Sequence, residues 1–129
     1  MKAEAAIRAL LIAHAPLIAQ VPATRILPGL IPLGTVLPAI AYNLISGVPQ
    51  KSIDMSTQIV RARIQVSVQT KTYPQQKQII ELIKAACDAK QGTIAGYHID
   101  SVMADIDGPD LRDDDAGIYM QTVDFIVKY

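Results

Sequence analysis

The stretch QIVRARIQVSVQT, residues 58–70, is the clearest structural signal in this chain. Its apolar residues alternate with polar ones over ten positions, which is the period of a strand with one buried face. The apolar face consists of Val60, Ala62, Ile64, Val66 and Val68. We therefore predict a half-buried strand that turns this face toward the core and carries Arg61 and Arg63 on the other face.

A helix is predicted directly after this strand. Thr72 is typical of an N-cap, with Gln75 three residues later as its capping-box partner and Pro74 in the first turn. We expect the helix to run to about Lys90, with Gly92 in the C-terminal cap region. Its apolar stripe is made up of Ile79, Ile80, Ile83, Ala86 and Cys87.

A helix, an irregular arm and a further strand are expected before residue 58. Apolar residues at helical spacing predict a helix over residues 3–14, which Pro16 ends. Residues 16–35 form a proline-rich arm, because this proline spacing blocks both a long helix and a central strand. An apolar strand covered on both sides is expected over Val36–Ser46, followed by a turn over Gly47–Met55.

Two strands complete the chain, over Tyr97–Ile106 and Ile118–Lys128, joined by an acidic connection over Asp107–Gly117. The element order is therefore α-β-β-α-β-β in a single domain, residues 1–129. This order predicts an α+β fold with a mainly antiparallel four-stranded sheet and two helices packed on one side. Residues expected to be buried together are Ile64, Val66, Ile79, Ile83 and Phe125.

Composition excludes several classes of protein. The chain has 129 residues, 12 basic and 12 acidic, and this neutral balance argues against a basic nucleic-acid binder or a polybasic membrane-surface protein. A lone cysteine excludes an internal disulfide framework and fits a reducing, cytoplasmic origin. Charged residues near the N-terminus argue against a secretory signal, and the dense prolines after it break any membrane-spanning helix.

The residues that most often carry chemistry give no catalytic, cofactor or metal site. His14 and His98 have no ligand partner at i+3 or i+4. Cys87 lies on an apolar helix stripe, where a free cysteine behaves as a small hydrophobe. A core or surface role is therefore the expectation for all three residues.

The acidic run does not have the spacing of an EF-hand calcium-binding loop. It contains Asp105, Asp107, Asp110, Asp113, Asp114 and Asp115. Counted from Asp105, glycine falls at position 4 instead of 6, and position 12 is Ala116 instead of a glutamate. The simplest interpretation is a solvated turn between two strands; an adventitious cation site and paired carboxylates for hydrolysis are the alternatives.

Charge is distributed unevenly along the chain. Residues 1–84 hold nine basic and three acidic residues, a net charge of +6, whereas residues 85–129 hold three basic and nine acidic residues, a net charge of −6. Folding either interleaves the halves into a neutral surface or leaves a dipolar subunit that contacts its neighbours through unlike patches. The candidates for such a subunit interface are Arg61, Arg63, Lys71, Asp110, Asp113, Asp114 and Asp115.

The order of features resembles the tail-completion, or tail-terminator, proteins of long-tailed phages and prophages. The arm contains two short proline motifs, Ile26-Leu27-Pro28 and Val36-Leu37-Pro38. An apolar strand and the basic alternating strand follow, and a helix after Tyr73-Pro74 leads to two final strands. The resemblance covers nearly the whole chain.

The resemblance implies a structural protein of the virion tail, assembled in the bacterial host cytoplasm, without enzymatic activity or cofactor. It implies a hexameric ring that caps the tail tube, ends tail polymerisation and allows head–tail joining. Its partners would be copies of itself, the tube protein and head or neck proteins, with DNA passing as non-specific cargo and no membrane contact. The alternatives are another neck or tube component of a phage tail or injection machine, or a small ligand-binding or metal-dependent α+β domain.

Overall fold

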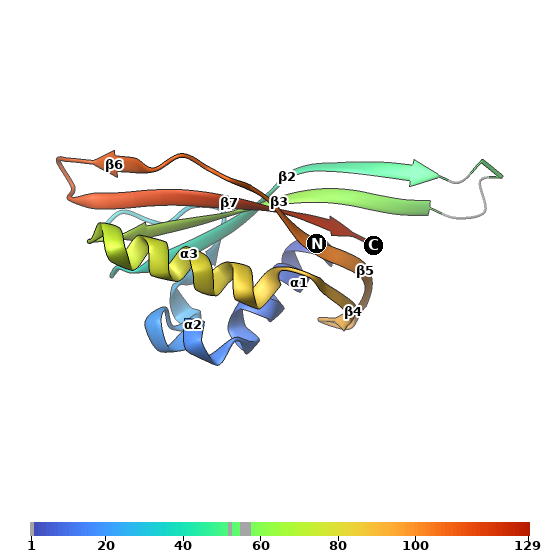
Figure 1. The fold of residues 1–129 in the computed structure, drawn as a ribbon, viewed down its shortest axis with the longest axis horizontal. Coiled ribbons are helices and arrows are strands. Elements are labelled where there is room, and N and C mark those ends of the chain that lie inside the picture. Colours follow the sequence, from blue (N-terminus) through green and yellow to red (C-terminus); the bar gives the residue numbers. More distant parts are fainter. Residues whose placement is uncertain (1, 52, 55–57) are drawn as a thin grey trace.

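The computed structural model describes residues 2–51, 53–54 and 58–129. Nearly half of the described residues are in strands, with helices near the N-terminus and one longer helix in the middle of the chain (Figure 1). The helices are α1 (Lys2–Ala13), α2 (Ala15–Gln20), the short 3-10 helix η1 (Ala23–Arg25) and α3 (Tyr73–Cys87). The strands are β1 (Ile26–Pro28), β2 (Ala39–Lys51), β3 (Gln58–Thr70), β4 (Lys90–Ile94), β5 (Tyr97–Asp107), β6 (Leu111–Asp113) and β7 (Ile118–Lys128).

The prediction of a mainly antiparallel four-stranded sheet is wrong. The described strands form one mixed seven-stranded sheet in the order β1-β2-β3-β7-β5-β4, with β6 paired to β7 beside this path. The β1–β2 pair is parallel and the other pairs are antiparallel. The two ends of β7 therefore have different neighbours: β6 pairs with Ile118–Met120, and β5 pairs with Val123–Lys128.

The missed strands β1, β4 and β6 are too short and too irregular in sequence to show a strand period. They have three to five residues each and include Pro28, Gly92 and the charged pair Arg112-Asp113. They are strands because the long neighbours β2, β5 and β7 offer them a backbone edge: β4 and β6 each form a hairpin with the strand that follows, and β1 pairs with β2 across the intervening loop.

The boundaries of the long elements also differ from expectation in places. The alternating strand has the bounds predicted for it, but β2 continues through much of the turn predicted over Gly47–Met55, of which Ser52 and Met55 lie outside the described residues. The helix predicted to reach Lys90 ends at Cys87, because Ala89 adopts a positive φ of 56° and β4 begins immediately afterwards.

The helices pack against one face of the sheet (Figure 1), with α3 against β3, β5 and β7 and α1 against β2 and β3. The five residues predicted to form the core are all fully buried in one cluster. Cys87 belongs to this cluster, and burial raises the pKa of its thiol to about 12. The prediction that Cys87 packs in the core is thus confirmed.

The proline-rich arm contributes to this core although it lacks long regular structure. Pro16 sits in the first turn of α2, where its missing N–H has no helical partner to lose. Leu17, Val21 and Ile26 are buried in the main cluster. None of the described helices is long and apolar enough to span a membrane.

Candidate functional site: the outer face of the sheet

The face of the sheet opposite the helices, here called the outer face, carries the polar side of the alternating strand. In β3 the even-numbered residues from Ala62 to Thr70 are buried, so Arg61, Arg63 and the later odd-numbered residues point outward. Residues paired across strands share a face, which places Asp124, Ile126 and Lys128 of β7 on the outer face as well. The predicted interface residues can therefore be located relative to this surface.

Arg63 lies at the centre of the outer face and is neutralised within its own chain. Its guanidinium is 2.6 Å from Asp105 and 3.1 Å from Asp124. Hydrogen bonds to Asp105 and then Asp124 raise the pKa of Arg63 above its usual value. Arg63 thus joins β3, β5 and β7 across the sheet, and both of its carboxylate partners come from the acidic half of the chain.

Asp110 is held against α3 and is not free in a solvated turn. Lys77 Nζ lies 2.6 Å from its carboxylate, the Tyr73 hydroxyl donates to it at 2.7 Å, and Gln76 Nε2 donates at 3.4 Å. The contact with Lys77, followed by that with Tyr73, lowers the pKa of Asp110 below its usual value. One helical face thus fixes the start of the acidic connection, and Lys84 adds an ion pair to Asp107.

Sequence reasoning missed these partners of the acidic connection. Lys77 and Lys84 are seven residues apart, so they lie on one face of the helix two turns apart. Asp107 and Asp110, in the connection, have the opposite charge. The matching charges were a usable signal, but the sequence did not reveal that the connection passes beside α3.

The acidic tip, Asp113–Asp115 at the β6–β7 turn, is exposed at one end of the sheet. Asp114 pairs with Arg112 at 2.7 Å, and Asp113 accepts a backbone hydrogen bond from Ala116 at 3.2 Å. Lys71 follows the last residue of β3 at this same end, because Thr70 pairs with Tyr119. The three aspartates therefore have one cation, Arg112, paired with them in the described structure.

Arg61 lies at the opposite end of β3. It is directly across from Lys128 of β7 and from Val48 of β2. Within the described part of the chain neither cation makes an ion pair, in contrast to Arg63, Lys77, Lys84 and Arg112. The fold thus separates Arg61 from Lys71 and does not bring the three predicted basic residues into one patch.

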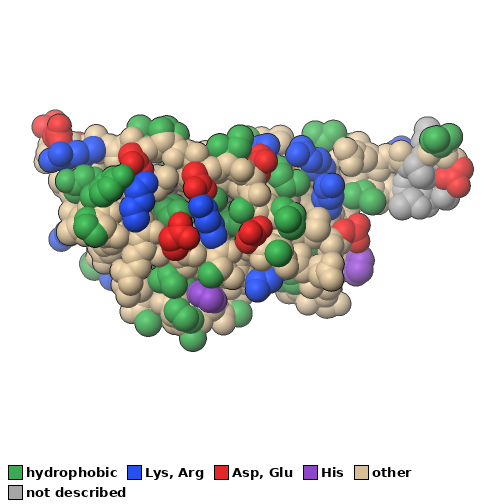
Figure 2. All heavy atoms as spheres, viewed as in Figure 1, with side chains coloured by type: hydrophobic (Ala, Val, Ile, Leu, Met, Phe, Trp, Pro, Cys, Tyr) green, Lys and Arg blue, Asp and Glu red, His purple; other side chains and the backbone are tan. Residues whose placement is uncertain are grey.

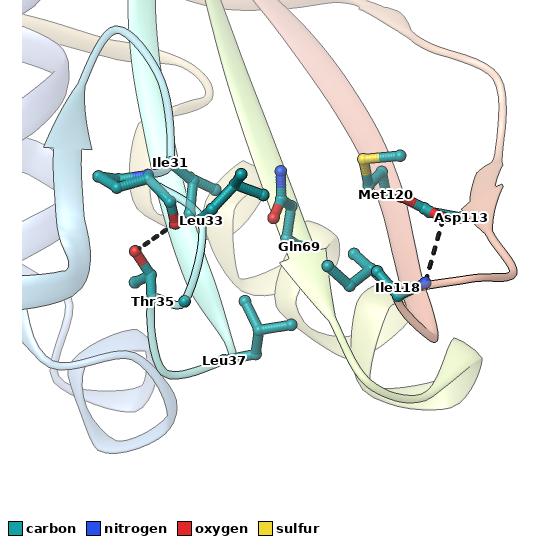
Figure 3. A pocket seen from close by; sticks show the side chains of 11 residues that line it. Ile31, Leu33, Thr35, Leu37, Gln69, Asp113, Ile118 and Met120 are labelled. Atoms are coloured by element: carbon teal, nitrogen blue, oxygen red, sulfur yellow. Dashed lines mark hydrogen bonds between the residues drawn. The ribbon is translucent and has the colours of Figure 1, made fainter.

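A shallow pocket lies beside the acidic tip (Figure 3). It measures about 130 Å³ and lies between the loop 31–37, Gln69 of β3 and the β6–β7 hairpin. Its lining is mainly aliphatic, with Leu33, Leu37, Ile118 and Met120 pointing toward it (Figure 3). Among the residues that the structure describes, no group of three or more His, Cys, Asp or Glu side chains is arranged to hold a metal ion.

Charged side chains of both signs alternate along the side of the molecule seen in Figure 2. A family described as "Tail completion protein gp17" matches residues 5–129. This chain belongs to the tail completion protein gp17 family.

A solved structure supports the same fold. A chain of the "Virion of native gene transfer agent (GTA) particle" superposes with a TM-score of 0.71 at 16% sequence identity, over 97% of this chain and 92% of the other. No curated protein matches the sequence. The family identifies the chain as a structural protein of the phage tail, a component of the virion, and confirms the resemblance drawn from the sequence.

Proposed function

We propose that this tail completion family member caps the tail tube as a homo-oligomeric ring, ending tube polymerisation and allowing the head to join. The observation that carries the proposal is the family match over residues 5–129. The ring is taken to be hexameric and to assemble in the bacterial host cytoplasm, with the tube protein on one side, head or neck proteins on the other and DNA as passing cargo.

The fold supplies surfaces suited to such a ring. On the side of β2 away from β3, β1 pairs only with Ile40–Tyr42, so residues 43–51 have no strand partner there in the described structure. Ile45 and Val48 in this segment are about half exposed, and the hairpin of β2 and β3 projects beyond the helical layer (Figure 1). A long exposed edge with apolar side chains favours association, and neighbouring subunits would cover it.

The proposal is tested by removing the chain from the tail assembly that contains it and measuring tubes by electron microscopy. Without a cap, tubes should grow to variable and excessive length and remain without heads, and the purified chain added back should restore both properties. Tubes of normal, uniform length with heads attached would contradict the proposal. Short or absent tubes would instead favour a role in tube initiation or in the tube itself.

A further inference from the structure

Adjacent copies in the proposed ring need complementary surfaces, and among the described residues the outer face has two cations without an ion pair at one end. Arg61 and Lys128 are cross-strand neighbours of like charge, an arrangement that repels and is destabilising without a counter-ion. The fold neutralises Arg63, two residues along the same strand, with two aspartates. We call Arg61 and Lys128, with the half-exposed Val48 beside them, the cationic row.

The acidic tip has the complementary composition. Asp113 is paired across the hairpin with Ile118 and Leu111 with Met120, so both lie on the same face as the cationic row. Leu111 is half exposed, and Leu33 in the neighbouring loop is fully exposed. Each end of the outer face thus combines uncovered apolar side chains with a charge excess, positive at one end and negative at the other.

The two ends cannot neutralise each other within one subunit. They are separated by the length of β3 between Arg61 and Thr70, roughly 30 Å for nine residues of strand. Charges this far apart in solvent are several screening lengths apart at physiological salt. A second copy placed end to end brings the opposite charges together, and a head-to-tail contact of this kind can close into a ring.

We propose that the cationic row of one copy docks the acidic tip of the next copy. This contact rests on the ring function proposed above. It leaves out three of the residues predicted for the interface, because Arg63 and Asp110 are already paired within the subunit and Lys71 lies at the acidic end. Apolar contact of Val48 with Leu111 and Leu33 supplies affinity, while the charges fix direction and register.

The test is a charge swap read by native mass spectrometry and analytical ultracentrifugation. The first variant, R61E/K128E, should raise the midpoint concentration of assembly at least tenfold, and so should the second, D113K/D115K. An equimolar mixture of the two should assemble, because each variant then presents to the other the charge that it lacks for itself. K71E, which also reverses a lysine beside an end of β3 but at the acidic end, is the matched control and should not weaken assembly.

Far-UV circular dichroism must show each variant folded before its assembly is interpreted. Unchanged assembly of folded R61E/K128E, or failure of the mixture, would overturn the contact while leaving a ring possible. If R61E/K128E lost duplex DNA binding but still assembled, the proposed contact would also be overturned. The cationic row would then be a DNA-binding surface.

The contact can also be tested in assembled tails, where weak association in isolation does not matter. A chain with C87A, K128C and D115C should form disulfide-linked multimers on mild oxidation, whereas C87A/K71C/D115C should form few. Equal yields in both would contradict the proposed pairing of ends. Absence of the chain from tail ends would instead contradict the proposed function itself.

Discussion

At the scale of single residues, Ile83 measures how tightly α3 is packed on the sheet. It is fully buried in the main cluster. Truncation to alanine removes three methyl or methylene groups and leaves a cavity, so Ile83→Ala should lower the free energy of unfolding by about 2 to 5 kcal/mol. Urea denaturation measures this loss.

A matched control for Ile83 is Ile106, which is 56% exposed on β5. Ile106→Ala makes the same chemical change where little apolar surface is buried, so its effect should stay within about 0.5 kcal/mol. An equal decrease in the free energy of unfolding for the two variants would mean that Ile83 of α3 is not packed in the core.

Cys87 should be almost unreactive in the native protein. Burial raises the pKa of its thiol to about 12, so at pH 8 very little thiolate, the reactive form, is present and reagent access is blocked. Alkylation by iodoacetamide at pH 8, followed by mass spectrometry, should be slow in buffer and fast in denaturant. Rapid labelling of folded protein would show that the C-terminal end of α3 opens readily.

At the scale of elements, the acidic connection should loosen in acid because of Asp110. Its pKa is lower in the folded chain than the usual 3.8, so the pairing with Lys77 and Tyr73 stabilises the fold above that value. This stabilisation is lost as the pH falls through the folded pKa. Carboxyl chemical shifts in an NMR titration should place the Asp110 midpoint below 3.8.

The variant Asp110→Asn should reproduce this loosening at neutral pH. Amide hydrogen exchange of residues 108–113 should become faster, because Lys77 loses its anionic partner. Asp115→Asn, at the exposed turn, is the control and should leave exchange in this segment unchanged. Identical exchange in both variants would mean that contacts other than Asp110 hold the connection.

Gly108 marks the place where the chain leaves β5 and continues along β7 toward β6. Its N–H donates to the Thr122 carbonyl at 2.7 Å, and an added Cβ would approach Thr122 Oγ1 more closely than 3.0 Å. Gly108→Ala should therefore destabilise the protein, and adding Thr122→Ala should recover part of the loss. Thermal denaturation of the single and double variants measures both effects; no recovery would mean that the backbone, and not Thr122 Oγ1, causes the strain.

At the scale of the whole molecule, the single domain stays a prediction that unfolding can test. One buried cluster includes residues from α1, α2, the arm, α3 and the central strands. A shared core of this kind should give one cooperative transition. Far-UV circular dichroism and Cys87 labelling should therefore report the same midpoint in denaturant; separate midpoints would indicate that the N-terminal helices or the arm unfold independently.

The sequence alone determined the central part of this protein. The alternation over residues 58–70 specified a strand and its buried face, and the Thr72 cap with the Ile79–Ile83 stripe specified a helix and the face that it buries. These signals are local, because side-chain direction repeats every two residues in a strand and every 3.6 in a helix. The same local order of elements supported the resemblance to tail completion proteins.

Only the tertiary structure decided the sheet and the grouping of charges. The short strands β1, β4 and β6 have too few residues to show a strand period of their own, and they form by pairing with the longer strands β2, β5 and β7. Arg61, Arg63 and Lys71 looked alike in the sequence, but the pairing of β3 with β7 joins Arg61 to Lys128, surrounds Arg63 with aspartates and leaves Lys71 at the far end. Whether a charge is neutralised depends on which strands lie side by side, and that is a property of the folded sheet.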